Sequence, residues 1–269
     1  MKKFLPVFLI LTLVIFGFAT KDRMRQVPNE SFGTGEVLKY KVHYGPITAA
    51  EAVIDISPTL HRINDRMCYK ATVYGKTNSF FDLTIRIRDT WQSYIDTAAI
   101  VPQRSFRNIE EGNYRKRETV DFDHFRNKAH MEKKKRSKDV EKKTFKVAEN
   151  VQDIVSGFYY LRTLDYDKME IGDKTKVKGF FDEENFDMVV EYRGRETVST
   201  KAGDIKAIKL VPRMPKNEMF NGENAITVYL SDDKNKIPVM IQAEMFVGSV
   251  KVNLYEYKNL KNKLMIARN

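Results

Sequence analysis

The chain contains one cysteine among 269 residues, so an intramolecular disulfide framework is excluded. This residue, Cys68, lies in the strand-like run from Met67 to Tyr74, where we expect a buried, inert thiol. The four histidines are scattered and lack the spacing of metal ligands. Gly-x-Ser-x-Gly, a Walker A loop, His-Glu-x-x-His and Cys-x-x-Cys are all missing. The sequence therefore predicts no catalytic residue, no metal, no cofactor and no enzyme activity.

Only one long apolar run is present, and it lies at the start of the chain. Lys2 and Lys3 precede an uncharged stretch from Phe4 to Phe18, and Gly17 to Ala19 supplies small residues for a signal peptidase. This layout predicts a secretory signal over residues 1–19. The run is short for a bilayer span, which needs about 20 residues, although an uncleaved anchor stays open as the alternative. We expect a periplasmic protein of a Gram-negative envelope that is not integral to the membrane after cleavage.

Acidic residues are outnumbered by basic ones. The 47 Lys and Arg against 36 Asp and Glu give a net charge of +11, and loss of Lys2 and Lys3 leaves +9. A basic exported protein can bind anionic lipid, acidic polysaccharide or an acidic partner, whereas export removes it from nucleic acid. The densest basic run is Lys133, Lys134, Lys135 and Arg136. We interpret it as a solvated hairpin tip, or alternatively as a site for an anionic envelope component.

The composition predicts one globular domain. Apolar content of 42% and aromatic content of 12% argue against disorder. Apolar side chains alternate with polar ones from Leu38 onward and again through the last hundred residues, which is typical of strands joined by hairpins. We expect a β-rich domain over residues 33–260, between a polar tether over 20–32 and a polar tail over 261–269. The predicted fold class is mainly β (α+β), a large curved antiparallel sheet or half-barrel with one main helix packed on it.

The predicted helix follows Asn150, which we interpret as its N-cap, with Asp153 three residues on. The 3.6-residue period then forms one apolar stripe, made of Val151, Ile154, Val155, Phe158 and Leu161. A second, short helix is expected between 78 and 88.

Several stretches carry a family resemblance. They include Tyr74 to Thr77, the helix from Asp153 to Arg162, Gly194 to Val198, and Leu230 to Asp233. From Gly33 to about Leu260 the chain resembles an exported bacterial family known only as a domain of unknown function (series number thirty-one-oh-eight). The resemblance implies no activity. By analogy of fold it implies a layout similar to the half-barrel carriers of lipoproteins or lipids.

These observations favour a non-enzymatic periplasmic carrier that holds a lipid or another apolar ligand in a groove between the sheet and the helix. We predict that Phe80, Phe81, Phe158 and Tyr159 bind this ligand. The alternative is a basic assembly or structural protein that docks on an anionic surface through the run at 133–136. A polysaccharide or cell-wall hydrolase is less favoured, because it needs two carboxylates placed across an open cleft.

Overall fold

The structure, a computed structural model, describes residues 24–136, 138–213 and 222–267. The predicted signal peptide lies outside these ranges. The strands are β1 (Val37–Tyr44), β2 (Ile47–Ile56), β3 (His61–Ile63), β4 (Arg66–Thr77), β5 (Arg88–Asp96), β6 (Pro102–Glu111), β7 (Tyr114–Asp123), β8 (Lys128–Lys135), β9 (Glu141–Lys146), β10 (Lys174–Phe181), β11 (Glu184–Thr200), β12 (Gly203–Arg213), β13 (Ile226–Ser231), β14 (Pro238–Glu244) and β15 (Ser249–Lys258). The helices are α1 (Ile154–Leu161) and the 3₁₀ turns η1 (Phe81–Leu83) and η2 (Tyr166–Lys168).

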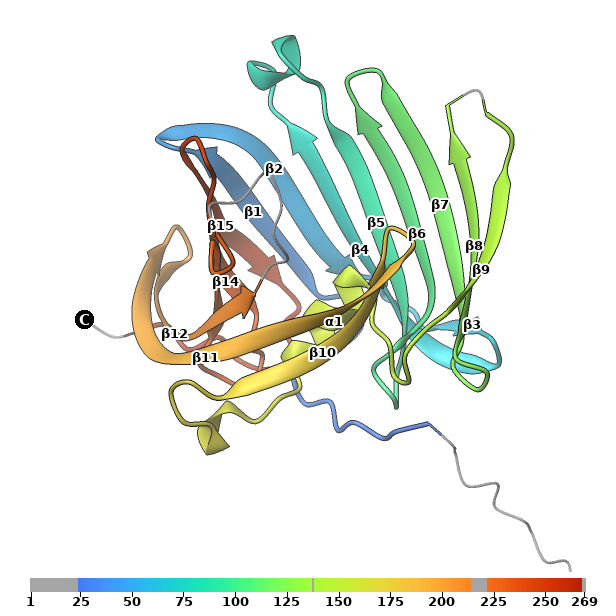
Figure 1. The fold of residues 1–269 in the computed structure, drawn as a ribbon. Helices are drawn as coiled ribbons and strands as arrows, with labels where there is room; N and C mark the ends of the chain where they lie inside the picture. The colour runs from blue at the N-terminus through green and yellow to red at the C-terminus, as the bar shows by residue number, and fades with distance from the viewer. Residues whose placement is uncertain (1–23, 137, 214–221, 268–269) are drawn as a thin grey trace, which may run out of the picture.

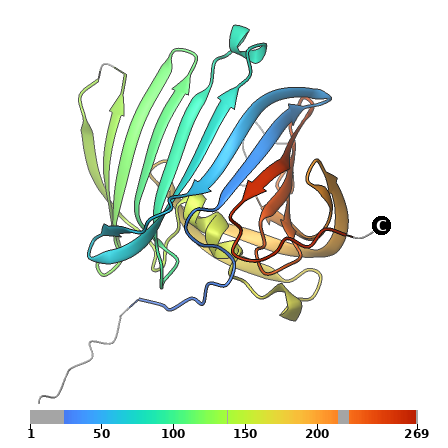
Figure 2. The ribbon, with the colours of Figure 1, turned by 180° about the vertical axis from the view of Figure 1, so that it is seen from behind.

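These strands form one antiparallel sheet in the order β10-β11-β12-β13-β14-β15-β1-β2-β4-β5-β6-β7-β8-β9, with β3 paired to β4. The first and last strands pair in the middle, since β1 lies beside β15. The sheet bends around a concave side that holds α1 (Figure 1), and Figure 2 shows its outer side. The predicted mainly β fold with a large curved antiparallel sheet is confirmed.

Alternation of side chains separates the two faces of the sheet. In β1, Leu38 and Tyr40 are buried on the concave side. Lys39 lies on the opposite face and pairs with Glu256, Nζ to Oε2 3.0 Å. A strand with this pattern can pair in only one register without exposing its apolar side chains. The same period-two pattern predicted these strands from the sequence.

Helix α1 begins later than predicted, at Asp153 rather than Asn150. An Asp153 carboxylate oxygen accepts from the Ser156 amide at 2.7 Å, and the Ser156 hydroxyl accepts from the Asp153 amide at 3.0 Å. This is a reciprocal capping box. Just before the helix, Gln152 pairs in parallel with Gly179 of β10. This strand-like pairing holds Gln152 extended, which is why the helix cannot start at the predicted cap.

The predicted tether is in its described part an integral segment of the domain. The Val27 amide donates to the Ala98 carbonyl at 2.8 Å. Phe32 is fully buried, and its ring centroid lies 4.7 Å from that of Tyr159 in α1. The prediction of a polar tether over residues 20–32 is wrong for this part, because Val27 and Phe32 both pack in the core.

The predicted polar tail also packs on the domain. Leu264 is buried in the core cluster beneath β12 to β15, and the Ala267 amide donates to the Asp204 carbonyl at 2.7 Å. The segment predicted as a polar tail is therefore part of the domain up to the last described residue. No helix among the described residues is long and apolar enough to cross a membrane.

A buried ion pair fixes the end of α1. Arg162, the C-cap residue, donates to both carboxylate oxygens of Glu36, at 2.6 and 2.7 Å. Its Nε donates to the Asn235 carbonyl at 3.1 Å, and its own carbonyl accepts from the Ser31 hydroxyl at 2.6 Å. Because both charged groups are almost fully buried, the bidentate geometry must offset their desolvation. One arginine thus ties the helix to the amino-terminal segment and to the turn after β13.

Candidate functional site

An apolar cavity lies between α1 and the concave face of the sheet. Its volume is about 310 Å³, at the lower end of the range of about 300–1,000 Å³ for small-molecule sites. The lining comes from α1 and six strands and comprises Tyr40, Ala52, Ile54, Val73, Trp91, Ile154, Val155, Phe158, Tyr159, Pro238, Ile241 and Val252. The cavity can therefore bury apolar surface from many directions at once.

The two tyrosines of the lining carry no charge. The Tyr40 hydroxyl donates to the Pro238 carbonyl at 2.9 Å. Burial, the main cause, raises the pKa of Tyr40 well above its ordinary value, and burial likewise raises the pKa of Tyr159. Both phenols therefore stay neutral at any physiological pH. Among the described residues, no ionised side chain lines the cavity, so an apolar group is the kind of ligand that fits it.

The helix presents two of its side chains to empty space. Val155 and Tyr159 pack in the core, whereas Ile154 and Phe158 are only partly buried. A second apolar hollow of about 200 Å³ lies on the other side of α1, against β10 and β11. Ile154 and Phe158 line both hollows and form the partition between them.

Small residues on neighbouring strands leave the space that forms the cavity. Ala52 of β2 pairs with Gly75 of β4, and a Cβ atom built on Gly75 would meet no atom within 4 Å. Tyr40 of β1 pairs with Ala52 on its other side. A large side chain at either small position would reduce the volume.

The four predicted ligand-binding residues do not lie together. Phe158 and Tyr159 line the cavity. Phe80 and Phe81 lie in the β4–β5 loop at the far end of the sheet, and neither lines either hollow. Phe80 is 68% exposed. The predicted short helix is only the 3₁₀ turn η1, and it holds these rings at the edge of the molecule, away from α1.

Trp91, the single tryptophan of the chain, lines the cavity from β5 and was not predicted as a site residue. The alternation of β5 did indicate that Trp91 points inward, because Trp91 shares the inward face with the buried Ser93 and Ile95. Which inward positions border empty space depends on packing between distant strands, and a single sequence does not reveal it.

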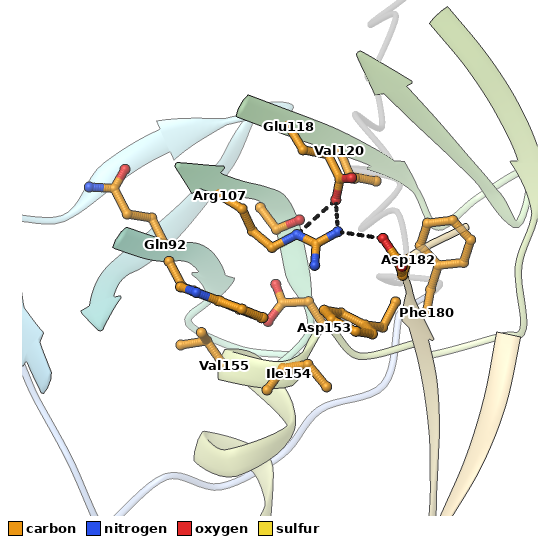
Figure 3. A pocket seen from close by; sticks show the side chains of 12 residues that line it. Gln92, Arg107, Glu118, Val120, Asp153, Ile154, Val155, Phe180 and Asp182 are labelled. Atoms are coloured by element: carbon orange, nitrogen blue, oxygen red, sulfur yellow. Dashed lines mark hydrogen bonds and ion pairs between the residues drawn. The ribbon is translucent and has the colours of Figure 1, made fainter. Parts of the chain in front are cut away.

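Charged side chains continue the inward face beyond Trp91. Arg107 of β6 pairs directly with Trp91, and its Cζ lies 5.2 Å from the Trp91 ring centroid. The guanidinium donates to Glu118 at 2.9 Å and to Asp182 at 3.4 Å. Figure 3 shows Arg107 between these two carboxylates. Phe181, next to Asp182, stacks on Trp91 with ring centroids 5.6 Å apart. Trp91 therefore marks the boundary between the apolar cavity and a region of paired charges.

The basic run in β8 is divided by the strand alternation. Lys133 points inward, is buried, and pairs with Glu183 and with Glu141, Nζ to Oε2 3.3 Å. Lys134, Lys135 and Arg136 are exposed and form no ion pair within the described residues. The expectation of a uniformly solvated run is wrong for Lys133, because Lys133 lies on the inward face of β8, whereas Lys134 lies on the outward face and Lys135 ends the strand.

Asp153 is a buried carboxylate at the start of α1. The Ser93 hydroxyl donates to it at 2.6 Å, and burial raises the pKa of Asp153 to about 6. Its oxygens are engaged by Ser93 and by the helix cap. Burial also raises the pKa of the Cys68 thiol to about 12. Among the described residues, no group of three or more His, Cys, Asp or Glu is placed to hold a metal ion.

Comparison with known proteins gives a family without an activity. The profile of the family described as "Protein of unknown function (DUF3108)" matches residues 39–255. No curated protein matches the chain. A solved structure of a beta-barrel-like protein of domain of unknown function DUF1849 from Brucella abortus is similar, with a TM-score of 0.55 and 9% identity. The alignment covers 87% of this chain and 98% of that one. The likeness is one of fold.

Two other solved structures are similar over much of their length with lower scores. One is a provisionally named lipoprotein from Parabacteroides distasonis, with a TM-score of 0.34, 14% identity, and coverage of 87% of this chain and 99% of that one. The other is a provisionally named exported protein with a YmcC-like fold from Bacteroides fragilis, with a TM-score of 0.35, 10% identity, and coverage of 88% and 100%.

Proposed function

Because the chain belongs to the DUF3108 family, whose description gives no activity, we propose a function from the site itself. The protein is a non-enzymatic binding or carrier protein of the periplasm, and it holds an acyl chain or another lipid-like group between α1 and the sheet. The observation that supports this proposal is the cavity of about 310 Å³ with an uncharged, almost wholly hydrocarbon lining. The predicted secretory signal at residues 1–19 supports the location.

The energetics favour an apolar ligand. Each methylene group that moves from water into the cavity contributes about 0.8 kcal/mol. An ionised group placed there would lose its hydration without gaining a charged partner. A ligand with an acyl chain inside and a polar head outside meets both conditions, because the paired charges of Arg107, Glu118 and Asp182 begin where the apolar lining ends.

Filling the cavity tests the proposal. Ala52→Phe places a ring in the empty space, so we expect the protein to fold with unchanged or raised stability. Lipid extracted from protein purified from its own host is measured by mass spectrometry. We expect wild type to carry stoichiometric acyl-containing lipid and Ala52→Phe to carry at least tenfold less.

Val53→Phe is the matched control. Val53 is the next residue of β2 and its side chain lies on the opposite face, outside both hollows. The lipid content of the Val53→Phe variant should equal that of wild type. The proposal fails if wild-type protein is empty, or if the Ala52 and Val53 variants carry the same amount of lipid.

A further inference from the structure

Exposed apolar side chains gather at one end of the sheet. Nine of the fifteen large apolar residues that are exposed in the described chain lie at the turns β1–β2, β4–β5, β6–β7, β8–β9 and β14–β15. We call these five turns the upper rim, since they lie along the top of the sheet in Figure 1. The nine residues are Tyr44, Ile47, Phe80, Leu83, Ile85, Tyr114, Val140, Phe246 and Val247.

Hydrogen bonds join neighbouring turns of the rim into one edge. The Tyr44 hydroxyl donates to the Val247 carbonyl at 2.7 Å. The Asn78 amide donates to the Ala49 carbonyl at 3.0 Å, and the Gly112 amide donates to the Arg86 carbonyl at 2.8 Å. These bonds hold four of the five turns at fixed positions relative to one another, so their apolar side chains can contact one surface together.

Nothing in the described chain covers the most apolar part of this edge. Leu83 is 86% exposed and Val247 is 76% exposed, and each lies at the tip of a different turn. None of the nine residues lines either hollow. Apolar side chains that project separately can each insert into a deformable surface, such as the headgroup region of a bilayer.

The charge of the rim selects the kind of bilayer. Five exposed cations lie in or beside its turns and form no ion pair within the described residues: Arg86, Lys134, Lys135, Arg136 and Lys138. In the β8–β9 turn only Asp139 opposes them among the described residues. Basic residues at a membrane surface attract anionic headgroups. Apolar tips beside unpaired cations are the pattern of an interfacial anchor.

We propose that the upper rim docks on an anionic lipid bilayer. The three turns richest in exposed apolar residues join the same strands that line the cavity, β1 with β2, β4 with β5, and β14 with β15. From Ile47 at the rim to Ala52 in the cavity lining is about 17 Å along β2. Docking at the rim therefore places the membrane at the ends of the strands whose inward side chains line the cavity. The inference goes beyond the proposed function, because docking does not require an occupied cavity.

Co-sedimentation with unilamellar vesicles tests the docking. The probes are vesicles of phosphatidylcholine alone and of phosphatidylcholine mixed with phosphatidylglycerol. We expect wild type to bind the mixed vesicles at low salt and to bind them less as salt is raised. Phe80→Ser with Leu83→Ser should bind the mixed vesicles at least tenfold more weakly. Phe246→Ser with Val247→Ser, in a different turn, should have the same effect.

A charge variant separates the two contributions. Lys134→Ser, Lys135→Ser and Arg136→Ser together should weaken binding to the mixed vesicles at least tenfold, since each cation contributes about fivefold. Binding to phosphatidylcholine alone should not change.

Phe125→Ser is the matched control, because Phe125 is 64% exposed at the opposite end of the sheet. Ala52→Phe should bind vesicles like wild type, so failure of the carrier proposal leaves this result unaffected.

Three outcomes overturn the docking. Wild type does not bind mixed vesicles, or Phe125→Ser weakens binding as much as the variant at Phe80 and Leu83. In the third, the rim residues mediate self-association in analytical ultracentrifugation without any vesicle binding, which assigns the surface to a second copy of the chain.

Discussion

At the scale of single residues, Asp153 is both a helix cap and a buried carboxyl group. It caps α1, and it is buried among apolar side chains that disfavour its ionised form. Burial raises its pKa to about 6, while the hydrogen bonds from Ser93 and Ser156 oppose that rise. Because its folded pKa lies above the ordinary aspartate value of about 3.9, the folded state binds more protons than the unfolded state between these two values. Ionisation of Asp153 therefore lowers stability as pH rises from about 4 to 6.

Asp153→Asn should remove this pH dependence. Asparagine caps helices about as well as aspartate and stays neutral. Relative to wild type, the variant should gain up to about 3 kcal/mol of unfolding free energy between pH 4 and pH 7, because the wild-type carboxyl ionises about two pH units higher in the folded state than in the unfolded state. Denaturant unfolding at the two pH values measures this difference. A constant difference between the two proteins would contradict the assignment. Asp153→Ala should be destabilised at both pH values, because it loses the cap.

Residue roles were predictable where they follow the local pattern. The apolar stripe of α1 gave Val155 and Leu161 as core residues, and both are buried. Phe80 was predicted to bind a ligand in the groove, but it is exposed and does not line the cavity. Exposing an apolar side chain to water is unfavourable, but residue type alone does not show which apolar side chains are nevertheless exposed at an interaction surface.

At the scale of elements, the β10–β11 hairpin completes the curved sheet without backbone pairing. β9 and β10 are the two edges of the sheet. Side chains of the β10–β11 hairpin reach β9: Glu183 pairs with Lys143 at 2.9 Å, and the side-chain amide of Asn185 donates to the Lys146 carbonyl at 2.9 Å. The adjacent Asp182 pairs with Lys116 at 2.7 Å, and this hydrogen bond is the main cause that lowers the pKa of Asp182. The tip of the hairpin is thus held mainly by ion pairs rather than by backbone hydrogen bonds between strands.

Neutralising the tip should loosen the hairpin. In Asp182→Asn with Glu183→Gln, we expect about tenfold faster hydrogen exchange of the amides near Phe181, since pairs of this exposure contribute up to about 1 kcal/mol each. Exchange in β1 and β2 should not change. Asp187→Asn is the control, because Asp187 pairs with Lys176 within the hairpin itself. Equal exchange in the two variants would show that the ion pairs do not hold the seam.

The elements were predictable in kind and less so in extent. Period-two alternation predicted the strands, because each strand has one inward face. The start of α1 and the docking of the two ends of the domain were not predicted. They depend on contacts between segments distant in sequence, such as Gln152 with Gly179 and Leu264 with the core.

At the scale of the whole molecule, the shape of the sheet fits the proposed task. A curved sheet leaves an apolar cavity beneath α1, and the strands that line it end in exposed apolar turns. The sequence predicted the sheet, the helix and a groove between them. It did not predict where the cavity lies or that the turns form a continuous edge, because both arise from the register of strands across the whole sheet.

The most direct measurement uses Trp91, the only tryptophan, which lines the cavity. Bromine atoms on an acyl chain quench tryptophan fluorescence only at close contact. Titration of protein from which bound lipid has been removed, with a brominated fatty acid below its micelle-forming concentration, should quench Trp91 in a saturable way in wild type and in Val53→Phe, but not in Ala52→Phe. The absence of quenching in wild type, or equal quenching when the cavity is filled, would contradict an acyl-binding cavity.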